Sequence, residues 1–279
     1  MKKTNDNNNN KKIYFKEIVK SIFLLLFFFA LCYIIFSVIN THILAKDFAY
    51  DMTNKYNFYS ENIFSIDKIY FFSSATADNN EQNKALWDLN IHQFTDIALY
   101  INNNNSQNNF TSENTINSLS IENINFNNIS IGEPNLYFKS ITNFGKYIKD
   151  DNNLINNNLS FEILDNTNEI NYELPQIHNT CDEPITLSYI NSSIVKNKII
   201  TDISEPLTFN GSLLKKSGIT ISSISGVVSF DIRIKTNSNK TFVANVYFSV
   251  PLGQNDSNNV YSGQYIYETN PNIRFIRQE

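Results

Sequence analysis

The apolar and polar positions of the chain follow two different patterns. Residues 21–39 form one run without a charged side chain, whereas much of the later chain alternates between apolar and polar positions. Read as a helix, the run extends about 28 Å, which is close to the hydrocarbon thickness of a bilayer. The pattern predicts a single transmembrane helix at residues 21–39 that contacts the lipid bilayer.

A cleaved signal peptide is the alternative interpretation of this run. The first small residue at a suitable distance is Ala45, but Ile43 occupies the position two before it, where a cleavage site has a small residue. A lipid-modified cysteine normally follows Gly or Ala, but Cys32 follows Leu31. We therefore interpret Cys32 as an apolar residue inside the helix. A retained anchor is favoured, and cleavage near Ala45 stays open.

The lysines beside the run predict its orientation. Residues 1–20 carry six lysines and two carboxylates, a net charge of +4, whereas only Lys46 and Lys55 follow within twenty residues of Ile39. The positive-inside rule then places the N-terminus in the cytoplasm and the C-terminal region outside the cell. We expect a single-pass protein of the cell membrane with a basic, Asn-rich cytoplasmic tail at residues 1–20.

Beyond the anchor, a period of two in the apolar positions predicts strands. Residues 228–250 alternate on both sides of a turn at 237–239, which is typical of a hairpin with one buried face. Residues 159–174 repeat this design around a turn at 165–169. Residues 94–101 are apolar on both faces from Asp96 onward, as expected of a strand covered on both sides. Further strands are predicted at 66–77 and 185–190.

These strands predict an all-β extracytoplasmic region behind the helix. Its length suits one or two β-sandwich modules of the immunoglobulin-like kind. Pro175 and Pro184 bracket a short segment between two strand-rich halves, which favours a linker there. The predicted divisions are a juxtamembrane stalk at 40–57, a β-rich module at 58–174, a linker at 175–184 and a β-sandwich module at 185–279.

Composition narrows the setting and the partners. The chain contains 47 Asn and abundant Ile, Phe, Tyr and Lys, all encoded by AT-rich codons, so we expect a bacterial source with an AT-rich genome. Residues 21–279 carry a net charge of −9, and the chain has only three arginines, which argues against nucleic acid as a partner. With one cysteine in the helix, the exported part holds a single thiol and no internal disulfide.

The sequence offers little conventional catalytic chemistry. It contains no G-x-S-x-G elbow, Walker loop, H-E-x-x-H helix or paired C-x-x-C, so we predict no cofactor and no metal site. His92 has Asp88 and Asp96 four residues to each side, a spacing that aligns on a helix but not on a strand. We therefore predict His92 to be a surface histidine.

The sharpest candidates for catalysis are Cys181 and His178 in "HNTC". A cysteine nucleophile needs a nearby base or cation to stabilise its thiolate. Thr180 and Cys181 resemble the last two residues of the TLxTC motif of sortases, the wall-anchoring transpeptidases, although Ile177 and His178 stand where that motif has Thr and Leu. A lone cysteine most often packs as a small apolar residue, which we take as the ordinary interpretation of Cys181.

Three functions fit these observations. The favoured one is a non-catalytic envelope protein, tethered by residues 21–39, whose β-region binds an envelope protein or a cell-wall partner. The second is a membrane-anchored, sortase-like cysteine enzyme acting on the wall, which requires an exposed and acidic Cys181. The third is a pilin-like or secretion-assembly subunit, because such subunits share the basic tail, apolar helix and β-rich head.

Overall fold

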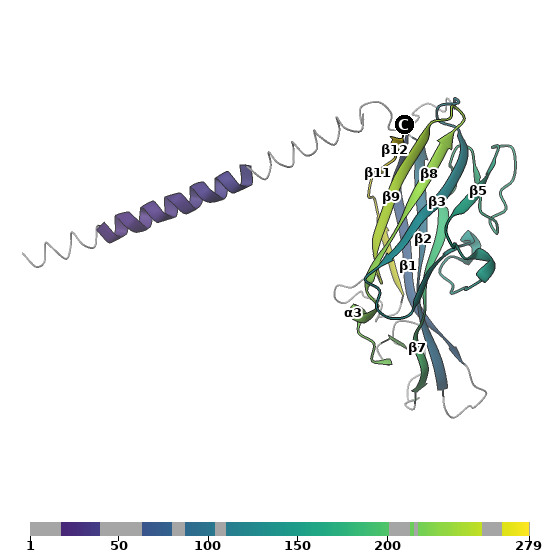
Figure 1. Cartoon of the computed structure of the whole chain (residues 1–279), viewed down its shortest axis with the longest axis horizontal. Helices are drawn as coiled ribbons and strands as arrows, with labels where there is room; N and C mark the ends of the chain where they lie inside the picture. Colours follow the sequence, from purple (N-terminus) through teal and green to yellow (C-terminus); the bar gives the residue numbers. More distant parts are fainter. Residues whose placement is uncertain are drawn as a thin grey trace, which may run out of the picture. The chain divides into compact units, whose positions relative to one another are not determined.

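The structure is a computed structural model of the chain. It describes residues 18–39, 63–79, 87–103, 110–200, 213–214, 217–252 and 264–278. Residues 1–60 and 61–279 form two compact units, the first containing a helix and the second built mainly from strands (Figure 1). The predicted stalk at residues 40–57 lies outside the described residues.

The helix of the first unit is Ile18–Ile39. It is 22 residues long, its most apolar 18-residue window has a mean hydropathy of 3.0, and none of that window is buried. At 1.5 Å per residue it extends about 33 Å, enough to cross the hydrocarbon core of a bilayer. The predicted apolar helix at 21–39 is thus confirmed as a helix long and apolar enough to span a membrane.

The second unit consists of strands and a few short helical turns. The strands described are β1 (Phe64–Asn79), β2 (Trp87–Asn103), β3 (Ile116–Asn127), β4 (Glu133–Phe138), β5 (Leu159–Leu164), β6 (Gln176–His178), β7 (Ile185–Ile200), β8 (Gly226–Thr236), β9 (Thr241–Val250), β10 (Tyr265–Thr269), β11 (Ile273–Arg274) and β12 (Ile276–Gln278). The short helices are η1 (Ile141–Asn143), η2 (Asp151–Asn153) and α3 (Ile221–Ile224).

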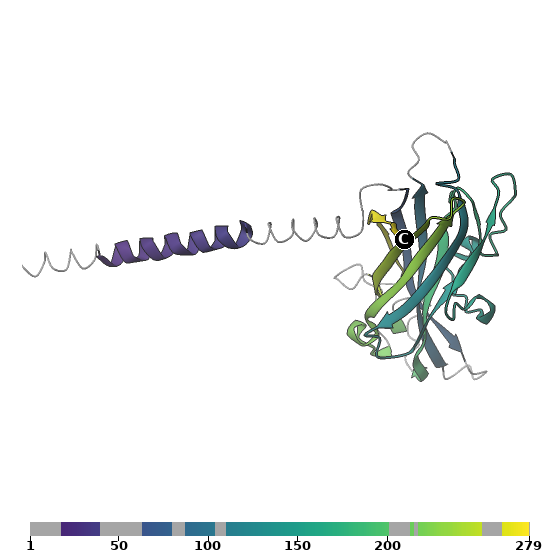
Figure 2. The same cartoon turned by 45° about the horizontal axis from the view of Figure 1, so that its top comes forward.

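The strands form two sheets. Sheet A has the order β10-β1-β2-β7-β4, with β11 also paired to β1, and sheet B has the order β12-β9-β8-β3-β5-β6. Neighbouring strands are antiparallel in both sheets except for the parallel pair β5–β6. In both views β3, β8 and β9 lie in front of β1 and β2 (Figure 1, Figure 2). The all-β prediction is confirmed at the level of two sheets behind one apolar helix.

The best-predicted element is the hairpin at residues 228–250. Strands β8 and β9 pair in continuous register from Gly226 opposite Val250 to Lys235 opposite Thr241. Alternate residues of both strands are buried, as the period of two requires for a sheet with one face on the core. The predicted strands at 66–77, 94–101 and 185–190 are also confirmed, within β1, β2 and β7.

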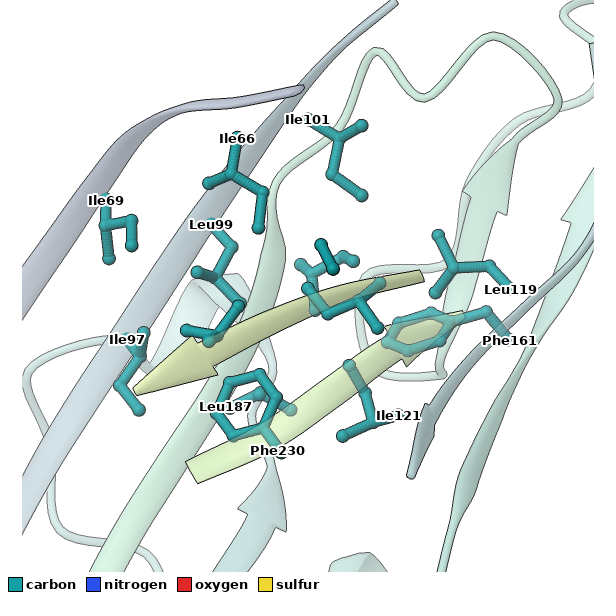
Figure 3. Close-up of a cluster of buried hydrophobic side chains, with 14 of the residues drawn as sticks. Ile66, Ile69, Ile97, Leu99, Ile101, Leu119, Ile121, Phe161, Leu187 and Phe230 are labelled. Carbon is teal, nitrogen blue, oxygen red and sulfur yellow. The ribbon is translucent and has the colours of Figure 1, made fainter. Parts of the chain in front are cut away.

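One large hydrophobic core lies between the sheets. Figure 3 shows side chains of β1, β2 and β7 in sheet A together with side chains of β3, β5 and β8 in sheet B. The rings of Phe64 and Phe242, one from each sheet, meet edge to face with their centroids 5.5 Å apart. Full burial of such a side chain stabilises the fold by about 1.5–3 kcal/mol, so this shared core joins the two sheets.

A second, smaller core covers the far end of sheet A. There the strands β1, β2 and β7 extend beyond β8 and β9 (Figure 1). Ala75 and Ile91 on these strands pack with Leu213, Leu214 and Ile224, the last of these from α3. The short α3 region thus covers apolar strand residues that sheet B does not reach.

Residues 175–184 do not separate two sheets, as the predicted linker would. Strands from both sides of this segment pair in each sheet, β2 with β7 in sheet A and β3 with β8 in sheet B. Residues 61–279 form one compact unit, and the segment itself contains β6. Prolines mark breaks in strands equally well at a domain boundary and at a crossing between the sheets of one domain, so their positions could not distinguish the two.

The second predicted hairpin, at residues 159–174, is wrong in its second half. Strand β5 forms as predicted, but Asn171–Leu174 is a turn, closed by Leu174 N–H donating to the Asn171 carbonyl at 3.0 Å. Strand β5 pairs with β3 and, in parallel, with β6. Tyr172 and Leu174 are each 48% exposed, so their alternation lacks the buried face that would make it a strand.

Candidate functional site

The predicted pair Cys181 and His178 lies in a tight turn at the end of β6. Cys181 N–H donates to the His178 carbonyl at 2.9 Å, and Cys181 adopts a positive φ of 62°. The side chain of Cys181 is only 3% exposed and belongs to the main hydrophobic core. Burial, with Asp182 and Glu183 nearby, raises the pKa of the Cys181 thiol far above its usual value. Its environment therefore suppresses the thiolate.

The ring of His178 is held by two acceptors. Its Nδ1 pairs with the Glu183 carboxylate, and its Nε2 lies 2.9 Å from the Asn168 carbonyl oxygen. A carbonyl and a carboxylate can only accept, so both ring nitrogens donate and the ring is an imidazolium. The bond to Asn168, with Glu183 adding to it, raises the pKa of His178. With its two nitrogens engaged, His178 fixes the loop of residues 168–183 and does not serve Cys181 as a base.

The prediction that His92 is a surface residue is wrong. His92 lies in β2 and is 5% exposed, stacked on the ring of Tyr147 with the centroids 5.3 Å apart. Its Nδ1 accepts Ser193 N–H at 2.9 Å, so Nε2 carries the proton and donates to Asp78 at 3.0 Å. Burial lowers the pKa of His92. The sequence spacing suggested no packing partner because Tyr147 and Ser193 are distant in the chain.

The most unusual chemical feature is a buried ion pair on the outer face of sheet A. Lys139 Nζ lies 3.4 Å from Asp96 Oδ2, and the two side chains are 3% and 0% exposed. Asp96 also accepts Ser188 Oγ–H at 2.5 Å and Gly145 N–H at 2.7 Å. Charged groups are almost never buried without a specific partner, so this pair defines a distinct site on the outer face of sheet A.

Residues 139–155, called the cap segment, close over this site. After β4 the chain makes η1, a turn at Gly145 and η2, and then returns to β4 where Leu154 bridges to Tyr137. Phe144, Tyr147 and Leu154 pack onto a cluster of Phe72, Phe94, Tyr137 and Ile190 on the outer face of the sheet. The cap segment thereby gives sheet A a second apolar covering and excludes water from the ion pair.

An exposed patch occupies the uncovered part of the same face. This outer tyrosine patch consists of Lys68, Tyr70, Tyr100, Ile266 and Glu268. The two tyrosine rings meet edge to face at 5.8 Å, Lys68 Nζ lies 5.2 Å from the Tyr70 ring, and Lys68 pairs with Glu268 at 3.3 Å. Ile266, on the edge strand β10, is 71% exposed. Tyrosines and an exposed edge strand suit contact with another molecule.

Sequence reasoning did not identify the ion pair or the patch. One signal was present, because Asp96 is a carboxylate within a strand that reads as covered on both sides. Its partner Lys139 could not be found in the same way, since the pairing requires β2, β7 and β4 to be neighbours in sheet A. Among the described residues, no group of three or more His, Cys, Asp or Glu side chains could hold a metal ion.

No protein-family model, curated protein or solved structure matches this chain.

Proposed function

We propose that the chain is a single-pass protein of the bacterial cell envelope whose β-sandwich lies outside the cell and binds or scaffolds other envelope components without catalysis. The observation that carries the proposal is the helix Ile18–Ile39, whose most apolar 18-residue window has a mean hydropathy of 3.0 and is not buried. Lysines concentrated before residue 21 favour an inward N-terminus by the positive-inside rule.

The outer tyrosine patch supports a binding role for the exported unit. Interfaces are enriched in tyrosine, which combines a large apolar ring with a hydroxyl that tolerates water. Strand β10 is also an edge strand of sheet A, so the edge that points away from β1 is suited to pairing with a strand from a partner. An envelope protein or a cell-wall component is the partner that the proposed location makes available.

The chemistry at Cys181 favours a non-catalytic role over the sortase-like one. A cysteine enzyme needs an accessible thiolate with a base or cation beside it. Cys181 is buried in the main core with a raised pKa, and His178 is bonded to Glu183 and Asn168 instead. We therefore assign Cys181 a packing role.

We further propose that the sandwich is immunoglobulin-like. The order β1-β2-β7-β4 in sheet A corresponds to strands A, B, E and D of that fold, and β9-β8-β3 in sheet B corresponds to G, F and C. Strand β5 takes the place beside β3 that strand C′ fills in variable-type domains, but here it follows the D-position strand in the chain instead of preceding it. The pairing of β10, β11 and β12 onto the edges is a further addition.

Site-specific labelling with a membrane-impermeant maleimide tests the location and the binding surface together. Three variants are made in a Cys32→Ala background that keeps Cys181. Each introduces one cysteine: in place of Thr4, of Ser249 on the exposed side of β9, or of Asn102 beside the patch. On intact cells we expect rapid labelling at Ser249→Cys and none at Thr4→Cys until lysis. Native Cys181 should react only after denaturation, because it is 3% exposed.

Occupancy of the patch is measured by comparing rates. If a partner covers the patch, Asn102→Cys labels more slowly on cells than in the purified protein, whereas Ser249→Cys labels equally in both. Labelling of Thr4→Cys on intact cells would overturn the orientation, and loss of the N-terminal residues from the mature protein would show a cleaved signal peptide. Equal rates at Asn102→Cys in both settings would reject the patch as the binding surface.

A further inference from the structure

The register of sheet A brings Lys139 and Asp96 together although β7 lies between their strands. Asp96 in β2 is opposite Ser188 in β7, and Ser188 is opposite Tyr137 in β4. Lys139 follows Tyr137 by two residues and so lies on the same, outer face. From there its long side chain extends back across β7 to the Asp96 carboxyl group, with 3.4 Å between Nζ and Oδ2.

Each group at this site is positioned by its own hydrogen bonds. Ser188 Oγ–H donates to Asp96 Oδ1 at 2.5 Å, and Gly145 N–H donates to Oδ2 at 2.7 Å. Lys139 Nζ donates to the Lys146 carbonyl oxygen in the cap segment. An amine that donates to Lys146 can direct its lone pair at the Asp96 carboxyl carbon, whose two oxygens are both polarised by donors.

We propose that Lys139 and Asp96 join covalently, through an amide bond between Lys139 Nζ and Asp96 Cγ that the folded domain forms by itself. The bond would tie the centre of sheet A to the start of the cap segment. This inference is independent of where the chain resides and of what it binds.

The atoms and protons of the step balance without any co-reactant. The neutral amine attacks Cγ of the protonated carboxyl group, and the negative charge of the tetrahedral intermediate develops on Oδ2, where Gly145 N–H stabilises it. A proton passes from the attacking nitrogen to Oδ1 by way of the Ser188 hydroxyl. The intermediate then collapses to the amide and releases Oδ1 as water, so the chain loses one water molecule.

Burial favours the neutral forms that this step requires. It raises the pKa of Asp96 and lowers the pKa of Lys139, in each case against the opposing effect of the partner's charge. A proton moved from the ammonium to the carboxylate inside the pair therefore removes two charges from a water-excluded site. Without that transfer the pair keeps the desolvation cost of two buried ions.

Proximity and the exclusion of water favour the amide. Well-oriented reacting groups can reach effective concentrations on the order of 10⁵–10⁸ M. This offsets the unfavourable equilibrium for amide formation from a separate amine and carboxylic acid in water. The cap segment packs Phe144, Tyr147 and Leu154 over the outer face of the sheet, and the Lys139 and Asp96 side chains are 3% and 0% exposed, so bulk water has little access to reverse the step. For a domain with a single thiol, the bond supplies the crosslink that a disulfide would otherwise give.

Peptide mass analysis of the full-length protein, purified in detergent, tests the bond directly. Glu113, Glu122 and Glu133 all lie between the two residues, so a glutamate-specific protease separates Asp96 from Lys139 unless they are linked. We expect one branched peptide that contains both residues and is lighter by one water than the sum of its two parts. Trypsin, which requires a free lysine side chain, should fail to cut after Lys139.

Three variants provide the controls. Lys139→Arg keeps a cation without a nucleophilic amine and Asp96→Ala removes the carboxyl group, so both should yield only the separate peptides. Lys146→Arg changes an exposed side chain whose carbonyl is retained, and should give the same branched peptide as the wild type. Separate peptides and cleavage after Lys139 in the folded wild-type protein, after prolonged incubation, would overturn the proposal and leave an unreacted ion pair.

Discussion

At the residue scale, two glycines with positive φ allow a matched test of packing. Gly132 has φ of +92°, and an added Cβ would lie 2.0 Å from Asn191 Oδ1 and 2.8 Å from Ile194 Cγ2. Gly218 has φ of +77°, but an added Cβ would meet nothing within 4 Å. Both positions require a backbone that L side chains rarely adopt, whereas only Gly132 also meets neighbouring atoms.

We therefore expect Gly132→Ala to destabilise the domain more than Gly218→Ala. The left-handed backbone alone costs about 1–2 kcal/mol, which is the whole effect predicted for Gly218→Ala. Displacing the buried Asn191 side chain adds about 1–3 kcal/mol for Gly132→Ala. Urea unfolding of both variants measures the difference. Equal losses of stability would show that Asn191 and Ile194 move aside without cost.

Two histidines give opposite contributions to the pH dependence of stability. The pKa of His92 is lowered below 6.5 by burial, so the unfolded chain binds the proton more tightly. Its contribution is complete well above pH 6.5 and is lost as the pH falls from that value through the lower folded pKa. The pKa of His178 is raised above 6.5 by Asn168 and Glu183, so its contribution is complete below pH 6.5 and is lost as the pH rises through the higher folded value.

The prediction is a change of pH slope in opposite directions for two matched variants. Relative to the wild type, His92→Gln should lose less stability on acidification from about pH 8 to about pH 5, and His178→Gln should lose more. The free energy of unfolding, measured in urea across this range, checks both. A parallel shift of the whole curve in either variant would mean that the histidine packs without titrating differently in the folded state.

At the element scale, the sequence predicted strands well where alternation coincides with a buried face. Strands β8 and β9 are nearest neighbours with a short turn, so their pattern and their partner are both local. The residues after β5 show that alternation alone is insufficient, because Tyr172 and Leu174 face solvent and their segment turns before β6. Strand β3 was missed because its more exposed second half and frequent Asn residues blur the period of two, and β4 was missed because its three buried residues are consecutive.

The candidate sites show the same limit. Cys181 and His178 are three residues apart, so their proximity is evident from the sequence, but the sequence showed neither the turn that joins them nor that the thiol faces the main core. Asp96 and Lys139 meet only because β7 lies between β2 and β4 in sheet A. Strand β7 comes later in the chain than both, after the cap segment, β5 and β6. Such a pair depends on the order of strands, which alternation does not encode.

At the scale of the whole molecule, the pairing across residues 175–184 determines how the exported unit unfolds. Strand β2 is bonded to β7 along most of its length, and β3 is bonded to β8, so each sheet depends on strands from both halves. A chain cut between the halves leaves β1, β2 and β3 without β7 and β8. The apolar faces of both fragments would then remain open to water.

We therefore expect residues 61–279, produced without the helix, to unfold in a single cooperative transition, with coincident changes in circular dichroism and tyrosine fluorescence. Residues 61–184 and 185–279, produced separately, should each lack a cooperative transition. Co-expression of the two fragments provides the control, because together they contain every strand and lack only the peptide bond between residues 184 and 185, so they should recover a folded complex. Two separate transitions in residues 61–279, or cooperative folding of residues 185–279 alone, would instead support two independent modules divided at the prolines.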